Sequence, residues 1–170
     1  MAAGKQILNK QLIALTDGKK VGEVKDLYFD EKMLKVVAIY LGAEGLINKK
    51  HFALERAKIQ LMGIDAWLVS DSASIPAETL PDADRLIMYS DVRGREIVTE
   101  GGTKIGAVDD VLFDADGDIV GFTLSKIEVK GPLADRKVIA RSAISTIGGK
   151  ESAMTTDLGQ AEATQVPAQA

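Results

Sequence analysis

Short apolar runs separated by turn residues recur along the whole chain and predict a protein built from β-strands. Apolar residues at helical spacing are nearly absent. In the order of the chain, the predicted strands are 12–16, 23–30, 35–41, 50–54, 59–62, 67–70, 96–99, 107–114, 119–125, 137–140, 144–147 and 152–155. Glycine and aspartate stand between many of these runs, where tight hairpin turns need them.

One stretch of this pattern occurs twice. Residues 18–30 return 84 positions later as residues 102–114, and 7 of the 13 aligned pairs are identical. Self-similarity at a fixed period marks a duplicated structural unit. Because the period is long, we expect two small domains of one kind, each of about 70 to 80 residues.

The spacing of apolar residues inside the repeat predicts a bent strand. Simple alternation is broken by the series Val24, Leu27, Phe29, and residues 108–113 repeat the same three-then-two spacing. One extra residue in a strand produces a β-bulge, which bends the strand and redirects its side chains. Bulges of this kind help a small sheet to curl closed, so we expect two small β-barrels.

The two copies also match after the repeated stretch. Arg56 and Arg141 occupy the same place, 85 positions apart. Two arginines at equivalent positions suggest a shared structural role, and we expect each to contact the carboxylate of its own copy, Asp26 or Asp110.

The connection ahead of these arginines differs most between the copies. Because the offset grows from 84 to 85, we expect one residue to have been gained there, where insertions cost little. Residues 42–49 form this loop in the first copy and residues 126–135 in the second. If the two copies bind different partners, these loops are the expected place of the difference.

The expected domain organisation follows from these observations. Residues 5–73 form the first barrel, 74–87 a linker that contains Pro76 and Pro81, and 88–155 the second barrel. Residues 156–170 have few large apolar side chains, so we expect a disordered tail.

Composition narrows the function classes. The net charge is −4, and residues 1–85 are neutral while residues 86–170 carry the whole excess. This charge balance argues against a protein surface that binds the phosphates of a nucleic acid. A local basic patch such as Lys49 and Lys50 is still compatible with it. There is no cysteine, and the longest apolar run, 36–41, is far shorter than a membrane span. No secretory signal is visible, so the sequence predicts a cytoplasmic protein.

The duplicated stretch, with its following apolar strand and arginine segment, resembles the PRC-barrel family. The residues that carry the resemblance are Gly18, Gly22, Asp26, Phe29, Asp30 and Arg56 in the first copy, and Gly102, Gly106, Asp110, Phe113, Asp114 and Arg141 in the second. We call these twelve the signature residues, and expect them to have structural roles. The resemblance implies an all-β fold of two PRC-type barrels in tandem.

The resemblance also implies a function in docking rather than in catalysis. The family includes the cytoplasmic domain of the photosynthetic reaction centre H subunit and the C-terminal domain of the ribosome maturation factor RimM. We therefore expect a non-catalytic adaptor that docks on a larger protein complex. A soluble H-like reaction centre subunit and a RimM-like ribosome-associated factor are the alternatives. The sequence has no membrane helix, which leaves only peripheral association with a membrane complex open.

No catalytic, cofactor or metal site is predicted. The aspartates of residues 114–118 resemble a calcium loop, but the glycine and the closing acid of an EF-hand are out of place, so a hairpin turn is preferred. The paired glycines at 18 and 22 precede a strand rather than a helix, unlike a phosphate-binding loop. His51 is the only histidine and has no second ligand. Trp67 lies in an apolar strand, and core packing or partial exposure at an interface is expected rather than stacking on a ligand.

Overall fold

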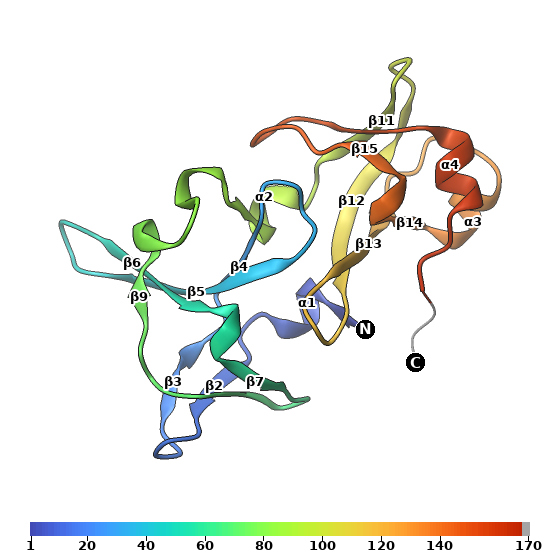
Figure 1. The fold of residues 1–170 in the computed structure, drawn as a ribbon. Helices are drawn as coiled ribbons and strands as arrows, with labels where there is room; N and C mark the ends of the chain where they lie inside the picture. Colours follow the sequence, from blue (N-terminus) through green and yellow to red (C-terminus); the bar gives the residue numbers. More distant parts are fainter. Residues whose placement is uncertain (168–170) are drawn as a thin grey trace.

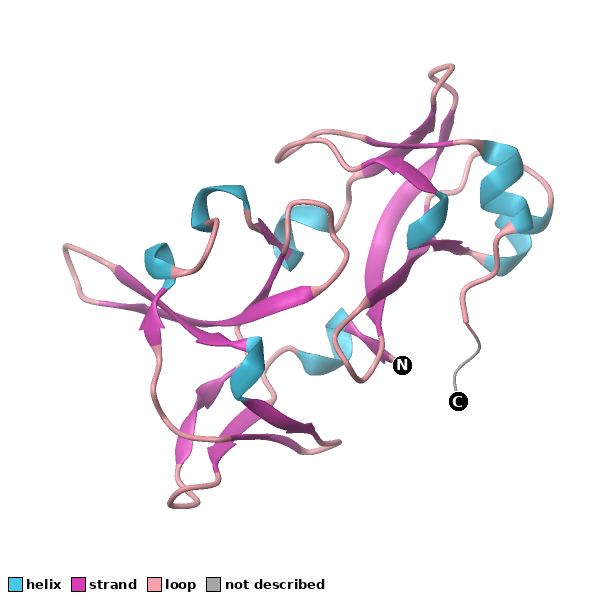
Figure 2. Ribbon diagram, viewed as in Figure 1, coloured by secondary structure: helices cyan, strands magenta, loops and turns pink. Residues whose placement is uncertain are grey.

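The computed structural model describes residues 1–167, and strands dominate it while every helix is short (Figure 2). We refer to residues 1–85 as the first half and to residues 86–167 as the second half. The two halves lie side by side (Figure 1). No helix within the described residues is long and apolar enough to cross a membrane.

The first half builds two sheets, one of which includes the strand β10 from the second half. One has the strand order β10-β4-β5-β6-β9, and the other has the order β3-β2-β8-β7. Their bounds are β2 Gln11–Ala14, β3 Lys20–Glu23, β4 Asp26–Phe29, β5 Val36–Glu44, β6 Lys50–Glu55, β7 Ile59–Met62, β8 Ala66–Val69, β9 Ile75–Pro76 and β10 Ile87–Met88. We call the second of these, the four-stranded one, the small sheet.

The second half builds one sheet of seven strands, which includes the strand β1 from the first half. Its order is β14-β13-β12-β11-β16-β15, with β1 paired to β12. The bounds are β1 Ala2–Ala3, β11 Glu96–Thr99, β12 Lys104–Phe113, β13 Ile119–Ser125, β14 Val138–Ala140, β15 Ile144–Thr146 and β16 Met154–Thr156. The helices of the chain are α1 Gly4–Ile7, α2 Tyr89–Val92, α3 Pro132–Arg136, α4 Leu158–Ala163 and the 3-10 turns η1 Arg56–Lys58, η2 Ala77–Thr79, η3 Ala83–Arg85 and η4 Arg141–Ala143.

The predicted bulge is confirmed in the second half. Val108 pairs with Leu124 and Asp110 with Thr123, so Asp109 is the extra residue of β12. In the first half the same place is a break between β3 and β4. The bend divides the first half into two sheets and leaves the second half with one curved sheet.

The sheets of the described residues do not close into barrels, so the prediction of two small barrels is not confirmed. Each strand order has two free ends. One apolar core runs through both halves, from Leu12 and Trp67 to Phe122 and Met154. A small sheet can bury its apolar face against a neighbouring sheet instead of curling closed on itself.

Strand register corrects the expected insertion. Ile39 pairs with Leu54, while Phe122 pairs with Ile139. The offset between the halves is therefore 83 before the differing loop and 85 after it. The turn after the repeat is one residue shorter in the second half, and the loop at 126–135 is two residues longer.

The segments predicted as linker and tail are more ordered than their composition suggests. Residues 75–88 contribute β9 and β10 to the five-stranded sheet of the first half. Ala77, Leu80 and Leu86 belong to a second, small apolar cluster on that sheet. In the tail, Asp157 caps α4 by accepting a hydrogen bond from the Gln160 N–H, and Ala161 is fully buried. The prediction of disorder is thus wrong for residues 156–163, and residues 168–170 lie outside the described part.

Candidate functional site

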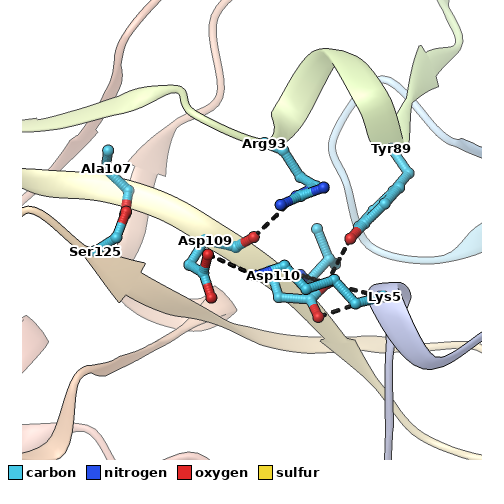
Figure 3. A network of polar contacts seen from close by, with 8 residues as sticks. Lys5, Tyr89, Arg93, Ala107, Asp109, Asp110 and Ser125 are labelled. Atoms are coloured by element: carbon cyan, nitrogen blue, oxygen red, sulfur yellow. Dashed lines mark hydrogen bonds and ion pairs between the residues drawn. The ribbon is translucent and has the colours of Figure 1, made fainter.

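The signature aspartates hold the two halves together. Asp110 is buried on β12, where its carboxylate accepts hydrogen bonds from the Tyr89 hydroxyl at 2.8 Å and from the Lys5 N–H at 3.2 Å (Figure 3). Its own strand contributes a third donor, the Val111 N–H at 2.8 Å. Lys5 is the second residue of α1, so a residue of the first half is anchored by a carboxylate of the second.

Asp26 makes the reciprocal contact. It is buried on β4 and accepts hydrogen bonds from the Leu27 N–H at 2.8 Å and from the Ser90 N–H of α2 at 3.2 Å. The strands that precede α1 and α2 also pair across the two halves: β1 pairs with β12, and β10 pairs with β4. Each half therefore receives a strand and a helical turn from the other half.

A second set of reciprocal contacts joins the turns. The Val36 N–H donates to the Gly117 carbonyl at 2.8 Å, and the Ile119 N–H donates to the Leu34 carbonyl at 2.7 Å. Val36 corresponds to Ile119 and Leu34 corresponds to Gly117, so the two hydrogen bonds are the same contact made in both directions. Such reciprocal contacts are characteristic of a twofold-symmetric interface. The two turns thus make equivalent contacts with each other.

The signature arginines belong to this interface, and the predicted contacts with Asp26 and Asp110 are wrong. Arg56 donates to the Ala115 carbonyl at 3.1 Å, and Arg141 donates to the Met33 carbonyl at 3.0 Å. Both arginines begin a 3-10 turn at a sheet end, so their long side chains reach the facing turn of the other half. Burial lowers the pKa of the Arg141 guanidinium.

The remaining signature residues build turns and core. Gly18 and Gly102 adopt positive φ values of 68° and 85° in equivalent turns, as glycine permits. Gly22 and Gly106 lie within β3 and β12, and Phe29 and Phe113 are fully buried.

Asp30 and Asp114 accept backbone N–H groups of their own turns, Asp30 at 2.7 and 2.8 Å and Asp114 at 2.9 and 3.0 Å. The hairpin-turn interpretation of residues 114–118 is confirmed. Within residues 1–167, no group of three or more His, Cys, Asp or Glu side chains is placed to hold a metal ion.

The other residues considered from sequence have ordinary partners. Trp67 is buried in the core. His51 is exposed, and its Nδ1 lies 2.8 Å from the Tyr40 hydroxyl. A cleft of about 480 Å³ contains Arg56, yet four basic and four acidic side chains line it. Its charge therefore does not select an anionic or a cationic ligand.

The differing loops have very different surroundings. In the first half, residues 45–49 form the tip of the β5–β6 hairpin, which extends away from the rest of the molecule (Figure 1). Leu46 is 100% exposed and Ile47 is 94% exposed at this tip. In the second half, the corresponding loop folds back as α3, and its Leu133 is fully buried.

A second contrast lies on the outer face of the small sheet. Ile13, Leu68 and Leu61 stand side by side on β2, β8 and β7, with Leu61 56% exposed. The second half has Val98, Thr155 and Thr146 at the matching positions of β11, β16 and β15. We call the first set the apolar row; sequence alone missed it, because register is needed to align three strands.

Comparison with known proteins supports one part of the resemblance. Residues 84–150 match the model of the PRC-barrel domain. This match covers most of the second half. No curated protein matches the chain.

Proposed function

We propose that this chain is a non-catalytic adaptor that docks on a larger protein assembly through its first half. In this proposal the first half is a second, diverged domain of the PRC-barrel type. The PRC-barrel match of the second half supports a role in protein interaction.

The apolar row is the observation that carries this proposal. The two halves make reciprocal backbone contacts with each other but differ on the outer face, where folding places little constraint. At these positions the first half has two leucines and an isoleucine, while the second half has two threonines and a valine. In the apolar row Leu61 is exposed and Ile13 and Leu68 are half-buried. Apolar side chains that gather on one face and remain partly open to solvent are typical of a surface that another protein covers.

The test is to give the first half the residues of the second. The variant Leu61→Thr/Leu68→Thr copies the threonines of β15 and β16 onto β7 and β8. In-cell crosslinking with mass spectrometry should find partner peptides near β7 and β8 in the wild-type protein, and the variant should lose them. Thr146→Ala, on the equivalent strand of the second half, is the matched control and should keep them.

Two results would count against the proposal. One is an unchanged partner set in the double variant, and the other is a wild-type protein that captures nothing specific. Because Leu68 is half-buried, thermal unfolding of each variant is recorded as well. The single variant Leu61→Thr changes a more exposed side chain and separates lost binding from lost folding.

A further inference from the structure

The tip of the β5–β6 hairpin presents apolar side chains to solvent without any cover. Leu46 and Ile47 are adjacent, and they are the two most exposed large apolar residues among those described. All residues from 43 to 51 are exposed, so the hairpin projects by roughly 10 Å at the usual rise of a strand. Folding does not require apolar residues there, because the tip contacts no core.

Two basic residues follow the apolar pair after one intervening residue, Asn48. Lys49 ends the turn and Lys50 begins β6. Within residues 1–167, neither ammonium group lies within 4.0 Å of a carboxylate. Glu44, at the end of β5, is the cross-strand neighbour of Lys50 and is the one acidic residue among residues 43–51.

The shape of the tip selects the kind of surface that it fits. Leu46 and Ile47 project from the end of a narrow hairpin. A partner surface therefore has to accept two protruding apolar side chains. A fluid bilayer does so, because apolar side chains enter the acyl region while neighbouring lysines stay at anionic headgroups. Each lysine near such a surface adds to the attraction.

We propose that the β5–β6 hairpin inserts Leu46 and Ile47 into an anionic phospholipid bilayer, with Lys49 and Lys50 at the headgroups. The acidic excess of the chain lies in the second half, and the hairpin extends away from that half (Figure 1). At physiological ionic strength, screening over about 8 Å leaves mainly the charges near the tip to act on the membrane. The apolar row lies on a different sheet, so this proposal does not depend on the adaptor function.

Vesicle sedimentation tests the proposal with the full chain. The protein should sediment with vesicles of phosphatidylcholine and phosphatidylglycerol in equal parts, and much less with phosphatidylcholine alone. Leu46→Asn/Ile47→Asn should lower the partition coefficient by at least about tenfold. Lys49→Gln/Lys50→Gln should lower it by about tenfold at low salt and less at high salt.

Ile64→Asn is the matched control, because Ile64 is 87% exposed in another turn, between β7 and β8. It should bind vesicles like the wild type. The proposal is overturned if the wild type does not bind anionic vesicles, if the hairpin variants bind unchanged, or if Ile64→Asn loses as much.

A second measurement reports insertion itself. The chain has no cysteine, so Leu46→Cys can be labelled at one site with an environment-sensitive fluorophore. Its emission should shift to the blue on addition of anionic vesicles, while the same label on Ile64→Cys should not respond. Equal responses at both positions, or none at Cys-labelled position 46, would contradict insertion of the hairpin.

Discussion

Replacing each signature aspartate by asparagine should destabilise the protein unequally, although the two residues are equivalent in sequence. Asp110 accepts hydrogen bonds from Lys5, Tyr89 and Val111, whereas among residues 1–167 Asp26 accepts them only from Leu27 and Ser90. The difference arises because Tyr89 occupies in the second half the place that Gly4 has in the first. Tyr89 therefore supplies a hydroxyl donor to one carboxylate only.

The size of the effect follows from the number of donors. A hydrogen bond to a charged group contributes about 1.5–3 kcal/mol, and asparagine keeps one acceptor oxygen. We expect Asp110→Asn to cost about 3 kcal/mol and Asp26→Asn about 1.5 kcal/mol. For a chain of this length the difference corresponds to about 3–6 °C in Tm.

Urea unfolding of a double-mutant cycle tests the origin of the difference. Asp110→Asn and Tyr89→Phe should be less than additive, with a coupling energy of about 1–2 kcal/mol. Asp26→Asn combined with Tyr89→Phe is the control and should be additive. A larger cost for Asp26→Asn than for Asp110→Asn, or a coupling near zero in the first pair, would refute this reasoning.

Three further predictions concern the same region and the surface beside it. Gly4→Ala should cost about 1–3 kcal/mol in chemical unfolding, because the added Cβ would lie 2.2 Å from the Tyr89 ring; an unchanged midpoint would contradict this close contact. Burial and a carboxylate acceptor raise the pKa of Tyr89, so its contribution to stability is complete below about pH 10 and is lost above it; Tyr89→Phe should flatten this alkaline decline in urea midpoints. Hydrogen bonds from Lys20 and Lys25 lower the pKa of Glu23 to about 2, so its contribution is present above the unfolded pKa near 4.5 and fades as the pH falls toward 2; Glu23→Gln should show a smaller acid-induced drop in Tm, and an identical drop would exclude the effect.

Local features of this fold could be predicted from the sequence. The break in alternation at Val108 and Val111 located the bulge at Asp109, and turn glycines located the hairpins. Both signals lie within a few residues of the structure that they specify. The contrast between loops 42–49 and 126–135 was also visible, because the two copies could be aligned.

The exchange between the halves could not be predicted in the same way. Lys5 and Asp110 are 105 positions apart, and nothing in either segment marks the other as its partner. Repetition indicated two like units but not whether each unit would complete its own sheet. The arginine contacts failed for the same reason: Arg141 does have a partner in an aspartate-containing turn, but that turn is in the other half and the acceptors are backbone carbonyls.

The exchange also determines how the unequal surfaces can work together. Because β10 and α2 complete the first-half sheet while β1 and α1 complete the second, separating the halves would expose strand edges and core in both. The exchange of strands and helical turns is therefore common to both halves, whereas outward positions such as Leu61 and Leu46 have diverged. In this arrangement the second half supports the sheet from which the β5–β6 hairpin projects. A substitution at Asp26 should then weaken binding by the first half through lost structure, without any contact between Asp26 and the bound surface.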